Sequence, residues 1–409
     1  MLKLPSILDK LFPNNYELID GTDEIFELNF ALWEYKNLSE AELIKRSAYF
    51  KSVNGKPTLH YQTCNLQNLE EIYKNSSLRT KAFFLNGKYS TGYATHSLFP
   101  YRGKFHPQMI RTLLSIAGIE KGDVVLDPMA GSGTLCVEAN LLGIDSIGID
   151  ISPFCCLMGR VKTFSLDLNP DKLTAIASNS KELFQKLNKE KAPVYFLSNS
   201  NDKDKPYYEI ILLAFLDAMG FARRSSKSLE VLFPVVLNRY VATINNFQKA
   251  RKELGLKIGK SKIIQGDVTN LPLENDSVDG VITSPPYSFA IDYAENDNPQ
   301  LRYLGYDVRD LKKDMLGLQG RGLNEKLQLY FEGCSKALAE MSRVAKQGSK
   351  IIIVIGTNEI QTKGVNLENK IKELAINQGL KFEGEMLKPI KGLSNTMQNE
   401  YILFFENTK

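Results

Sequence analysis

The sequence contains few residues that could form disulfides or hold a metal ion. It has only three histidines, and its five cysteines are Cys64, Cys136, Cys155, Cys156 and Cys334. The cysteine count is odd and no two cysteines form a CxxC pair, so neither a disulfide framework nor a zinc site is expected. We therefore predict reduced thiols and no metal centre.

Long apolar runs are also missing. The longest aliphatic run, 351–356, is far too short to cross a hydrocarbon core of about 30 Å. The opening residues, MLKLPSILDKLFP, lack the apolar core of a signal peptide. We therefore expect a cytoplasmic protein with no membrane partner.

A large excess of charge is absent from the chain as a whole. It carries 51 basic and 47 acidic residues, which excludes a uniformly basic nucleic-acid coat protein. The segment 221–262, however, holds ten basic residues against two acidic ones, a net charge of +8. Both a solvated helix face and a phosphate-contacting surface agree with this charge. The candidate nucleic-acid-binding residues are Arg223, Arg224, Lys227 and Arg239.

The composition and length indicate a folded protein of more than one unit. With 43% hydrophobic and 24% charged residues, the chain is neither collagen-like nor disordered. Its 409 residues suggest two or three domains at about 150 residues each. We predict a small mixed domain of unknown role in 1–90 and an α/β domain in two parts, 91–165 and 261–409. A basic helical insertion, 166–260, separates the two parts.

The α/β domain is predicted from alternating strand and helix patterns. An apolar strand over 124–129 is followed by a glycine-rich turn, a helix and a second strand over 146–152, which together form one βαβ unit. A capping box at Ser39–Glu42 predicts a further helix towards Phe50. The remaining predicted elements are a short helix at 67–76, a helix at 324–346, and strands at 262–268, 278–287, 350–357 and 401–407. This order predicts a doubly wound, Rossmann-like sheet.

The glycine turn, residues 127–134 with the sequence DPMAGSGT, is the first candidate binding site. Glycines let the backbone approach a ligand, and a helix N-terminus offers free amides. A dinucleotide fingerprint would need a third glycine where Cys136 stands, and there is no P-loop lysine. Asp127 suits a cationic amine, while Asp150 and Asp267, at two further strand tips, suit ribose hydroxyls and an adenine amine. Together the three carboxylates predict a pocket for a nucleoside with a cationic side arm.

DPMAGSGT, followed by GID and later by SPPY at 284–287, resembles the S-adenosylmethionine-dependent amino-methyltransferases of DNA. The match is closest to the N4-cytosine branch, in which Ser-Pro-Pro-Tyr is typical. KFHPQM at 104–109 resembles the motif that precedes the glycine turn in this family. The resemblance spans roughly 100–165 and 262–357, and residues 1–90 match no pattern of the family.

The resemblance implies S-adenosylmethionine as cofactor and double-stranded DNA with a specific site as partner. It also allows a cognate restriction endonuclease as a second partner. The insertion 166–260 is then the candidate DNA-recognition region, and Phe154 is expected on the adenine face of the cofactor. The implied cofactor-binding residues are Lys104, His106, Asp127, Pro128, Met129, Ala130, Gly131, Gly133, Thr134, Asp150, Ile151, Phe154, Asp267 and Val268.

The SPPY segment, Ser284, Pro285, Pro286 and Tyr287, is the predicted catalytic turn. An exocyclic amine is a poor nucleophile because its lone pair is conjugated with the ring. The Ser284 hydroxyl and the Pro285 carbonyl could accept its hydrogens, and the prolines stiffen the turn because proline fixes φ. Tyr287 offers a face for an extruded base, worth about 1–3 kcal/mol, and the base must be flipped out of a duplex. This chemistry needs neither a metal nor a covalent intermediate.

Several alternatives remain open at this point. Methylation of adenine N6 uses the same kind of turn, and RNA base methyltransferases have a similar sheet and glycine turn, usually with Asp or Asn in place of Ser284. A non-catalytic nucleic-acid-binding partner would keep the fold without the activity. A nicotinamide-dependent dehydrogenase is disfavoured by the missing third glycine and by the absence of a suitable histidine.

Overall fold

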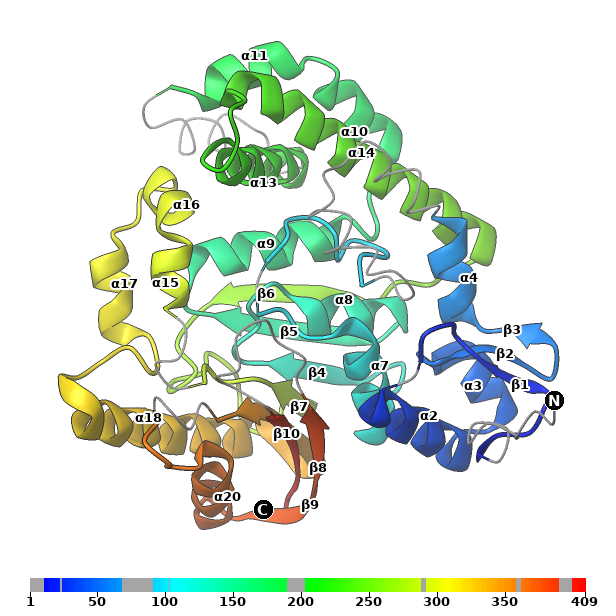
Figure 1. The fold of residues 1–409 in the computed structure, drawn as a ribbon, viewed down its shortest axis with the longest axis vertical. Coiled ribbons are helices and arrows are strands. Elements are labelled where there is room, and N and C mark those ends of the chain that lie inside the picture. Colours follow the sequence, from blue (N-terminus) through cyan, green and yellow to red (C-terminus); the bar gives the residue numbers. More distant parts are fainter. Residues whose placement is uncertain are drawn as a thin grey trace, which may run out of the picture.

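The computed structural model describes residues 11–22, 24–67, 91–101, 103–189, 203–287, 292–357, 362–389 and 399–409. Apart from Gln67, the helix predicted at 67–76 lies outside these residues. A seven-stranded sheet forms the centre of the molecule, with the strand order β6-β5-β4-β7-β8-β10-β9 (Figure 1). Its strands are β4 (Val124–Asp127), β5 (Asp145–Asp150), β6 (Ser261–Gln265), β7 (Val278–Thr283), β8 (Ala345–Gly356), β9 (Leu380–Pro389) and β10 (Asn399–Asn407).

The sheet is mostly parallel. Strands β6, β5, β4, β7 and β8 run in one direction, and β10 is antiparallel to both β8 and β9. The central parts of the parallel strands are apolar, as in Ile351–Ile355 of β8, because both faces are covered there. This confirms the predicted doubly wound α/β fold, including the strands at 124–129, 146–152 and 401–407, whose ends differ by a few residues. Strand β9 was not predicted from the sequence.

Successive residues of β8 show how the two faces are covered. Ile351 and Ile353 belong to the core beneath α18 (Gly322–Val344) and α20 (Leu367–Asn377). Ile352 and Val354 belong to the opposite core, beneath α7 (Pro107–Ile116). The alternation follows from the two-residue period of a strand. The helices α8 (Thr134–Leu141) and α9 (Pro153–Phe164) follow β4 and β5.

The N-terminal residues pack against the main sheet. They form a small antiparallel sheet in the order β1-β2-β3, and the predicted capping box of Ser39 and Glu42 is present at the start of α3. Phe30 and Leu43 share one core with Met109 of α7. The boundary near residue 90 stays a prediction. The elements of this region are β1 (Tyr16–Leu18), α2 (Ile25–Asn37), α3 (Glu40–Arg46), β2 (Phe50–Val53), β3 (Lys56–Pro57) and α4 (Leu59–Leu66).

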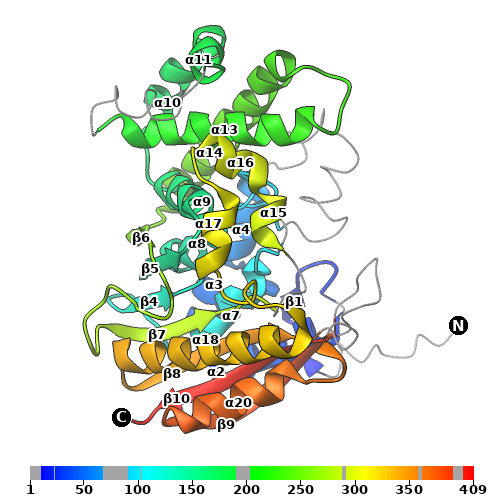
Figure 2. The same cartoon turned by 90° about the vertical axis from the view of Figure 1, so that its left-hand side faces the viewer.

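The segment between β5 and β6 is helical, as predicted. Its helices are α10 (Pro170–Ala177), α11 (Ser180–Leu187), α13 (Lys205–Ala222) and α14 (Leu229–Leu254), and they lie beyond α9 at one end of the molecule (Figures 1 and 2). Leu212 and Leu216 of α13 share a core with Phe233 of α14 and Met158 of α9. The insertion is therefore joined to the sheet domain through α9.

A chain of short helices follows β7. These are α15 (Tyr293–Asn296), α16 (Asn298–Tyr303) and α17 (Val308–Asp314), drawn in yellow in Figure 1. These helices are anchored, because Ala294 and Leu301 are buried in the core that contains α13 and α14. No helix in the described part of the chain is long and apolar enough to span a membrane.

Candidate active site

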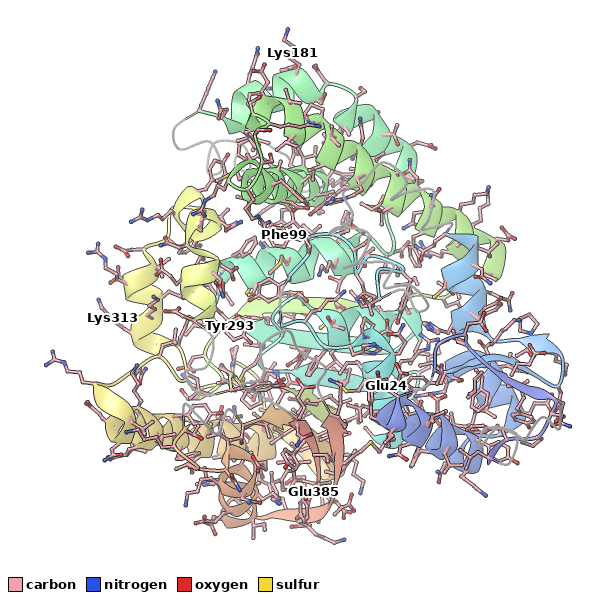
Figure 3. The ribbon with its side chains drawn as sticks, in the orientation of Figure 1. Glu24, Phe99, Lys181, Tyr293, Lys313 and Glu385 are labelled. Atoms are coloured by element: carbon pink, nitrogen blue, oxygen red, sulfur yellow. The ribbon has the colours of Figure 1, made fainter. Side chains whose placement is uncertain are left out.

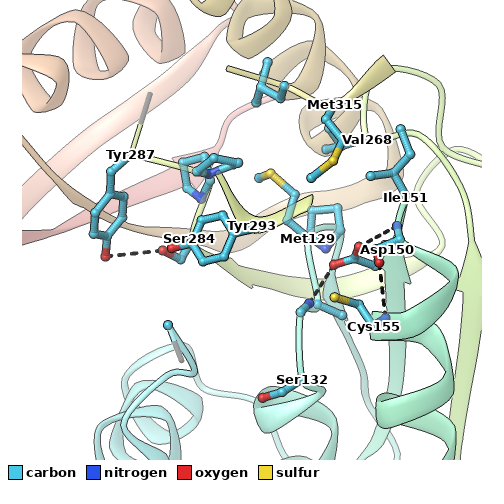
Figure 4. A pocket seen from close by; sticks show the side chains of 18 of the residues that line it. Met129, Ser132, Asp150, Ile151, Cys155, Val268, Ser284, Tyr287, Tyr293 and Met315 are labelled. Atoms are coloured by element: carbon cyan, nitrogen blue, oxygen red, sulfur yellow. Dashed lines mark hydrogen bonds between the residues drawn. The ribbon is translucent and has the colours of Figure 1, made fainter. Parts of the chain in front are cut away.

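A cavity of about 610 Å³ lies at the carboxyl ends of the parallel strands (Figure 4). Strands β5 and β6 lie on one side of β4 and β7 lies on the other, so the sheet changes winding direction between β4 and β7. Open α/β sheets bind ligands at such a switch point. The predicted site residues that line the cavity are Lys104, His106, Pro128, Met129, Ala130, Gly131, Thr134, Asp150, Ile151, Asp267, Val268, Ser284, Pro285, Pro286 and Tyr287. The fold thus brings the glycine turn and the SPPY turn into one cavity.

Asp150 holds the glycine turn in place. Its Oδ2 accepts a hydrogen bond from the Gly131 amide at 2.8 Å, and its Oδ1 accepts one from the Ser152 amide at 2.8 Å (Figure 4). Burial raises the pKa of Asp150 to about 6, although both amide bonds oppose this shift. The Asp150 carboxylate is therefore held in place by two amides and still lines the cavity.

Asp127 lies at the end of β4 and is fully buried. Its Oδ1 accepts hydrogen bonds from the Thr283 hydroxyl at 2.8 Å and from the Met129 amide at 3.2 Å. Its Oδ2 has no hydrogen-bond partner among the described residues, and burial raises the pKa of the carboxyl to about 7. Asp127 does not line the cavity, but it directly precedes Pro128, which does. An unsatisfied buried oxygen at this place is suited to a donor supplied by a ligand.

The cavity fits a nucleoside with a cationic arm, and therefore S-adenosylmethionine. Gly131 has a φ of +50°, and a Cβ built on it would meet no atom within 4 Å, so the backbone is open on that side. Asp127, whose Oδ2 has no hydrogen-bond partner among the described residues, is buried immediately before this turn. Asp267 lines the same cavity while its carboxylate accepts hydrogen bonds from the amide and hydroxyl of Thr269, at 2.9 and 2.7 Å.

Besides Asp127, two predicted cofactor-binding residues, Gly133 and Phe154, do not line the cavity. Phe154 is completely buried and makes an edge-to-face contact with Phe99, at 5.0 Å between ring centroids, so the structure does not place it against a cofactor. Phe154 is in the first turn of α9, and its side chain belongs to the core that contains α13 and α14. Gly133 is the N-cap of α8 with a φ of +76°, and a Cβ there would lie 2.9 Å from the Gly159 Cα. Gly133 therefore lets α8 and α9 approach closely.

Lys104 and His106 line the cavity from the segment before α7. The Lys104 ammonium donates a hydrogen bond to the Thr91 carbonyl at 3.1 Å, and burial lowers its pKa to about 8. His106 contacts the Phe26 ring, at 6.3 Å between centroids, and burial lowers its pKa to about 3. The imidazole is therefore uncharged at neutral pH.

The SPPY turn follows β7 and is held from two other elements. The Tyr287 hydroxyl donates a hydrogen bond to Glu400 Oε1 of β10 at 2.7 Å, and the Tyr330 hydroxyl of α18 donates one to the Pro286 carbonyl at 2.7 Å. The Ser284 hydroxyl donates to the Tyr287 oxygen at 3.5 Å. Burial, and then the charge of Glu400, raise the pKa of Tyr287 far above its usual value, so the phenol stays protonated.

Among the cavity residues that the sequence did not identify are four with polar side chains: Tyr293, Asp297, Lys388 and Glu400. Tyr293 lies close to Ser284 in Figure 4, and a Cβ on Gly103 would come within 2.9 Å of its ring. Asp297 accepts a hydrogen bond from the Tyr101 hydroxyl at 3.3 Å, and burial raises its pKa to about 7. The aromatic and acidic run after SPPY was the only sequence signal for Tyr293 and Asp297.

The basic segment 221–262 is divided in the structure. Arg239 forms an ion pair with the buried Asp217 at 2.5 Å, and its guanidinium lies over the Phe221 ring. It therefore contributes to the helical core. Lys260 and Lys262 lie at the amino end of β6. The cavity lies at the carboxyl ends of the parallel strands, so these two lysines are on the opposite side of the sheet domain.

The remaining three candidate cations, Arg223, Arg224 and Lys227, are exposed in the turn between α13 and α14. Gly220, one turn earlier in α13, lies beside Gln300 of α16, because a Cβ on Gly220 would be 3.6 Å from the Gln300 amide nitrogen. α16 directly follows Tyr293 and Asp297, which line the cavity. These three cations therefore follow the end of α13 that lies beside α16.

Comparisons with known proteins agree with this site. Residues 14–159 match the model of a family described as DNA methylase, of the N6/N4 type. The match includes residues 14–90, which is most of the N-terminal region that the sequence motifs left unassigned. Two relatives are the Type II methyltransferases M.MjaII of Methanocaldococcus jannaschii and M.BsoBI of Geobacillus stearothermophilus, each 25% identical to this chain. The alignments cover 75% of this chain and 78% of the first relative, and 66% and 67% for the second.

A shorter match involves a tRNA (guanine(10)-N2)-dimethyltransferase of Methanothermobacter thermautotrophicus. It is 38% identical over 53 residues, which is 13% of this chain and 16% of that protein. The family match and the two long alignments, together with a cavity suited to S-adenosylmethionine beside an SPPY turn, support an S-adenosylmethionine-dependent DNA amino-methyltransferase of the N6/N4 type.

Proposed function

We propose that this protein transfers a methyl group from S-adenosylmethionine to the N4 amine of cytosine in DNA. The observation that carries the proposal is the joint placement of the glycine turn and the SPPY turn in one cavity. The serine at position 284 supports cytosine over adenine, because its hydroxyl is the acceptor typical of the N4 branch.

Three carboxylates would hold the cofactor. Asp150 would accept hydrogen bonds from the ribose hydroxyls and Asp267 would bind the adenine amine. Asp127, buried immediately before Pro128 and with an Oδ2 that has no partner among the described residues, would attract the ammonium group from behind the turn. Bound S-adenosylmethionine supplies an activated methyl group on a sulfonium centre. The protein's own contribution is to fix the reacting amine in a desolvated position, which is a proximity effect.

The SPPY turn would bind the target amine. The Ser284 hydroxyl and the Pro285 carbonyl would accept the two amine hydrogens, which frees the nitrogen lone pair from conjugation. The turn is already held by Tyr330 and Glu400, so its acceptors require little rearrangement. The Tyr287 ring, whose hydroxyl is anchored, would stack on a flipped base.

Double-stranded DNA with a specific site is the proposed substrate. Arg223, Arg224 and Lys227 would contact phosphates, since they are exposed in the turn that follows the α16-facing end of α13. A cognate restriction endonuclease stays a prediction, in line with the Type II methyltransferases to which the chain is similar.

The test uses purified protein, methyl-labelled S-adenosylmethionine and duplex DNA of mixed sequence. The modified DNA is digested to nucleosides, and the labelled nucleoside is identified by mass spectrometry. N4-methylcytosine is the expected product, and the Ser284→Ala and Asp150→Asn variants should yield far less of it. N6-methyladenine alone would overturn the cytosine assignment and retain the family.

Methylation of RNA is the second candidate, because of the short match to a tRNA guanine-N2 enzyme. A parallel reaction with total tRNA in place of DNA separates the two. Label in RNA with none in DNA would replace the DNA proposal by this one.

A further inference from the structure

The hairpin formed by β9 and β10 brings an ion pair to the SPPY turn. Lys388 and Glu400 are direct cross-strand partners in this hairpin, and their side chains form an ion pair. Both side chains line the cavity and are only 16% exposed. The Lys388 ammonium also lies 5.5 Å from the centroid of the Phe26 ring, so α2 helps to fix its position.

Glu400 sets the direction of the hydrogen bonds in the turn. An ionised carboxylate only accepts hydrogen bonds, so the Tyr287 hydroxyl must donate to Glu400 Oε1, at 2.7 Å. The Tyr287 oxygen is then free to accept from the Ser284 hydroxyl, at 3.5 Å. The Ser284 hydrogen is thereby directed to the Tyr287 oxygen, and the lone pairs of the Ser284 oxygen remain for a donor in the cavity.

We propose that Glu400 is a positioning residue that acts through Tyr287 and makes Ser284 a hydrogen-bond acceptor for the substrate amine. This inference rests on the proposed function. A serine hydroxyl has one hydrogen to donate and two lone pairs that accept, so a Ser284 whose hydrogen is held by Tyr287 presents only acceptors to the amine. Lys388 also fixes the orientation of the side chain at position 400. Its ammonium binds Oε2 of Glu400, so the atom at that place must be an acceptor, and Oε1 is left for Tyr287.

The decisive variants are Glu400→Gln, Lys388→Met and the double variant. In Glu400→Gln, Lys388 binds the amide oxygen, so the amide NH2 faces Tyr287 and reverses the hydrogen bonds. We expect kcat to fall about 100-fold, with KM for DNA and for S-adenosylmethionine changed little. In the double variant the amide can turn and accept from Tyr287, so kcat should recover about tenfold. Lys388→Met alone should lower kcat much less than Glu400→Gln does.

Glu385→Gln is the matched control. Glu385 is on the same strand as Lys388 but pairs with Lys372 at 2.8 Å and does not line the cavity (Figure 3). This variant should keep the wild-type kcat. In a Tyr287→Phe background, Glu400→Gln should cause no further loss, because the connection to Ser284 is already broken. A wild-type kcat in Glu400→Gln, or no recovery in the double variant, would overturn the inference.

A readout independent of activity separates this inference from the proposed function. The NMR signal of the Tyr287 ring carbon that bears oxygen, assigned with Tyr287→Phe, reports whether the phenol donates or accepts. It should shift in Glu400→Gln and return towards the wild-type position in the double variant. A wild-type enzyme that methylates neither DNA nor RNA would refute the proposed function, whereas an unchanged signal in Glu400→Gln would refute the inference.

Discussion

At Asp127 and Asp150, burial favours the protonated carboxyl group, whereas binding of a cationic ligand needs the ionised carboxylate. Burial raises their pKa values to about 7 and about 6, so each carboxyl binds a proton more readily in the folded protein than in the unfolded chain. Their contribution to stability is therefore lost as the pH rises from about 4 to about 7. A cationic ligand that binds the ionised forms compensates for this loss, and its binding should release protons below pH 7.

The affinity for S-adenosylmethionine should therefore depend on pH. We expect the Kd to be about tenfold or more lower at pH 8 than at pH 5.5, because protonated Asp127 and Asp150 must ionise before they bind. Calorimetric titration at the two pH values, in two buffers of different ionisation enthalpy, measures both affinity and proton release. Asp127→Asn should bind weakly with a flatter pH profile. Equal affinity of the wild type at both pH values would contradict this expectation.

At the scale of elements, the close approach of α8 and α9 depends on one glycine. Gly133 combines a φ of +76° with a Cβ position only 2.9 Å from the Gly159 Cα. Its counterpart is Gly255, the C-cap of α14, which has a φ of +63° but no atom within 4 Å of its Cβ position. An alanine at Gly255 would introduce backbone strain alone, whereas an alanine at Gly133 would introduce backbone strain and steric overlap.

Gly133→Ala should destabilise the protein more than Gly255→Ala. Backbone strain alone should cost about 1–2 kcal/mol in Gly255→Ala, and overpacking should add about 1–3 kcal/mol in Gly133→Ala. Urea unfolding of the two variants measures the difference. Cofactor affinity should also fall in Gly133→Ala, since α8 begins at the glycine turn. Equal decreases in stability would show that α8 and α9 can separate without cost.

For the whole molecule, the near-neutral net charge of +4 conceals an uneven distribution. Exposed cations occupy the turn between α13 and α14, next to the end of α13 that contacts α16, whereas Lys260 and Lys262 lie at the amino ends of the parallel strands, away from the cavity. Arg239 neutralises Asp217 inside the helical core. The basic residues of the segment 221–262 therefore fall into three groups: exposed in a turn, paired inside the helical core, and exposed at the amino end of β6.

The salt dependence of DNA binding should distinguish these groups. Replacing Arg223, Arg224 and Lys227 with glutamine should weaken binding, and the slope of log K against log salt should fall by about 0.9 for each phosphate that the protein no longer neutralises. Lys257 is exposed in the connection between α14 and β6, shortly before Lys260 and Lys262. Replacing these three lysines with glutamine removes equal charge and should leave the slope nearly unchanged. Fluorescence anisotropy over a salt series measures both slopes. An equal reduction in both triple variants would show that the opposite edge also binds DNA.

The parts of the site that could be predicted from sequence are those encoded locally. DPMAGSGT and SPPY each follow an apolar strand, and the carboxyl ends of parallel strands meet at one edge of a sheet. The capping box at Ser39 and the helical insertion were likewise readable, because caps and apolar periodicity depend on near neighbours.

The tertiary structure decided what depends on distant parts of the chain. Glu400 meets Tyr287 across 113 residues of sequence, and only the register of β10 against β9 places it opposite Lys388. Phe154 turned inwards because Phe99 offered a buried aromatic partner. The sequence by itself determined the chemistry of the turns and the class of fold, since these follow from local pattern. Which side chains support that chemistry was determined by strand register and helix packing, which no short segment encodes.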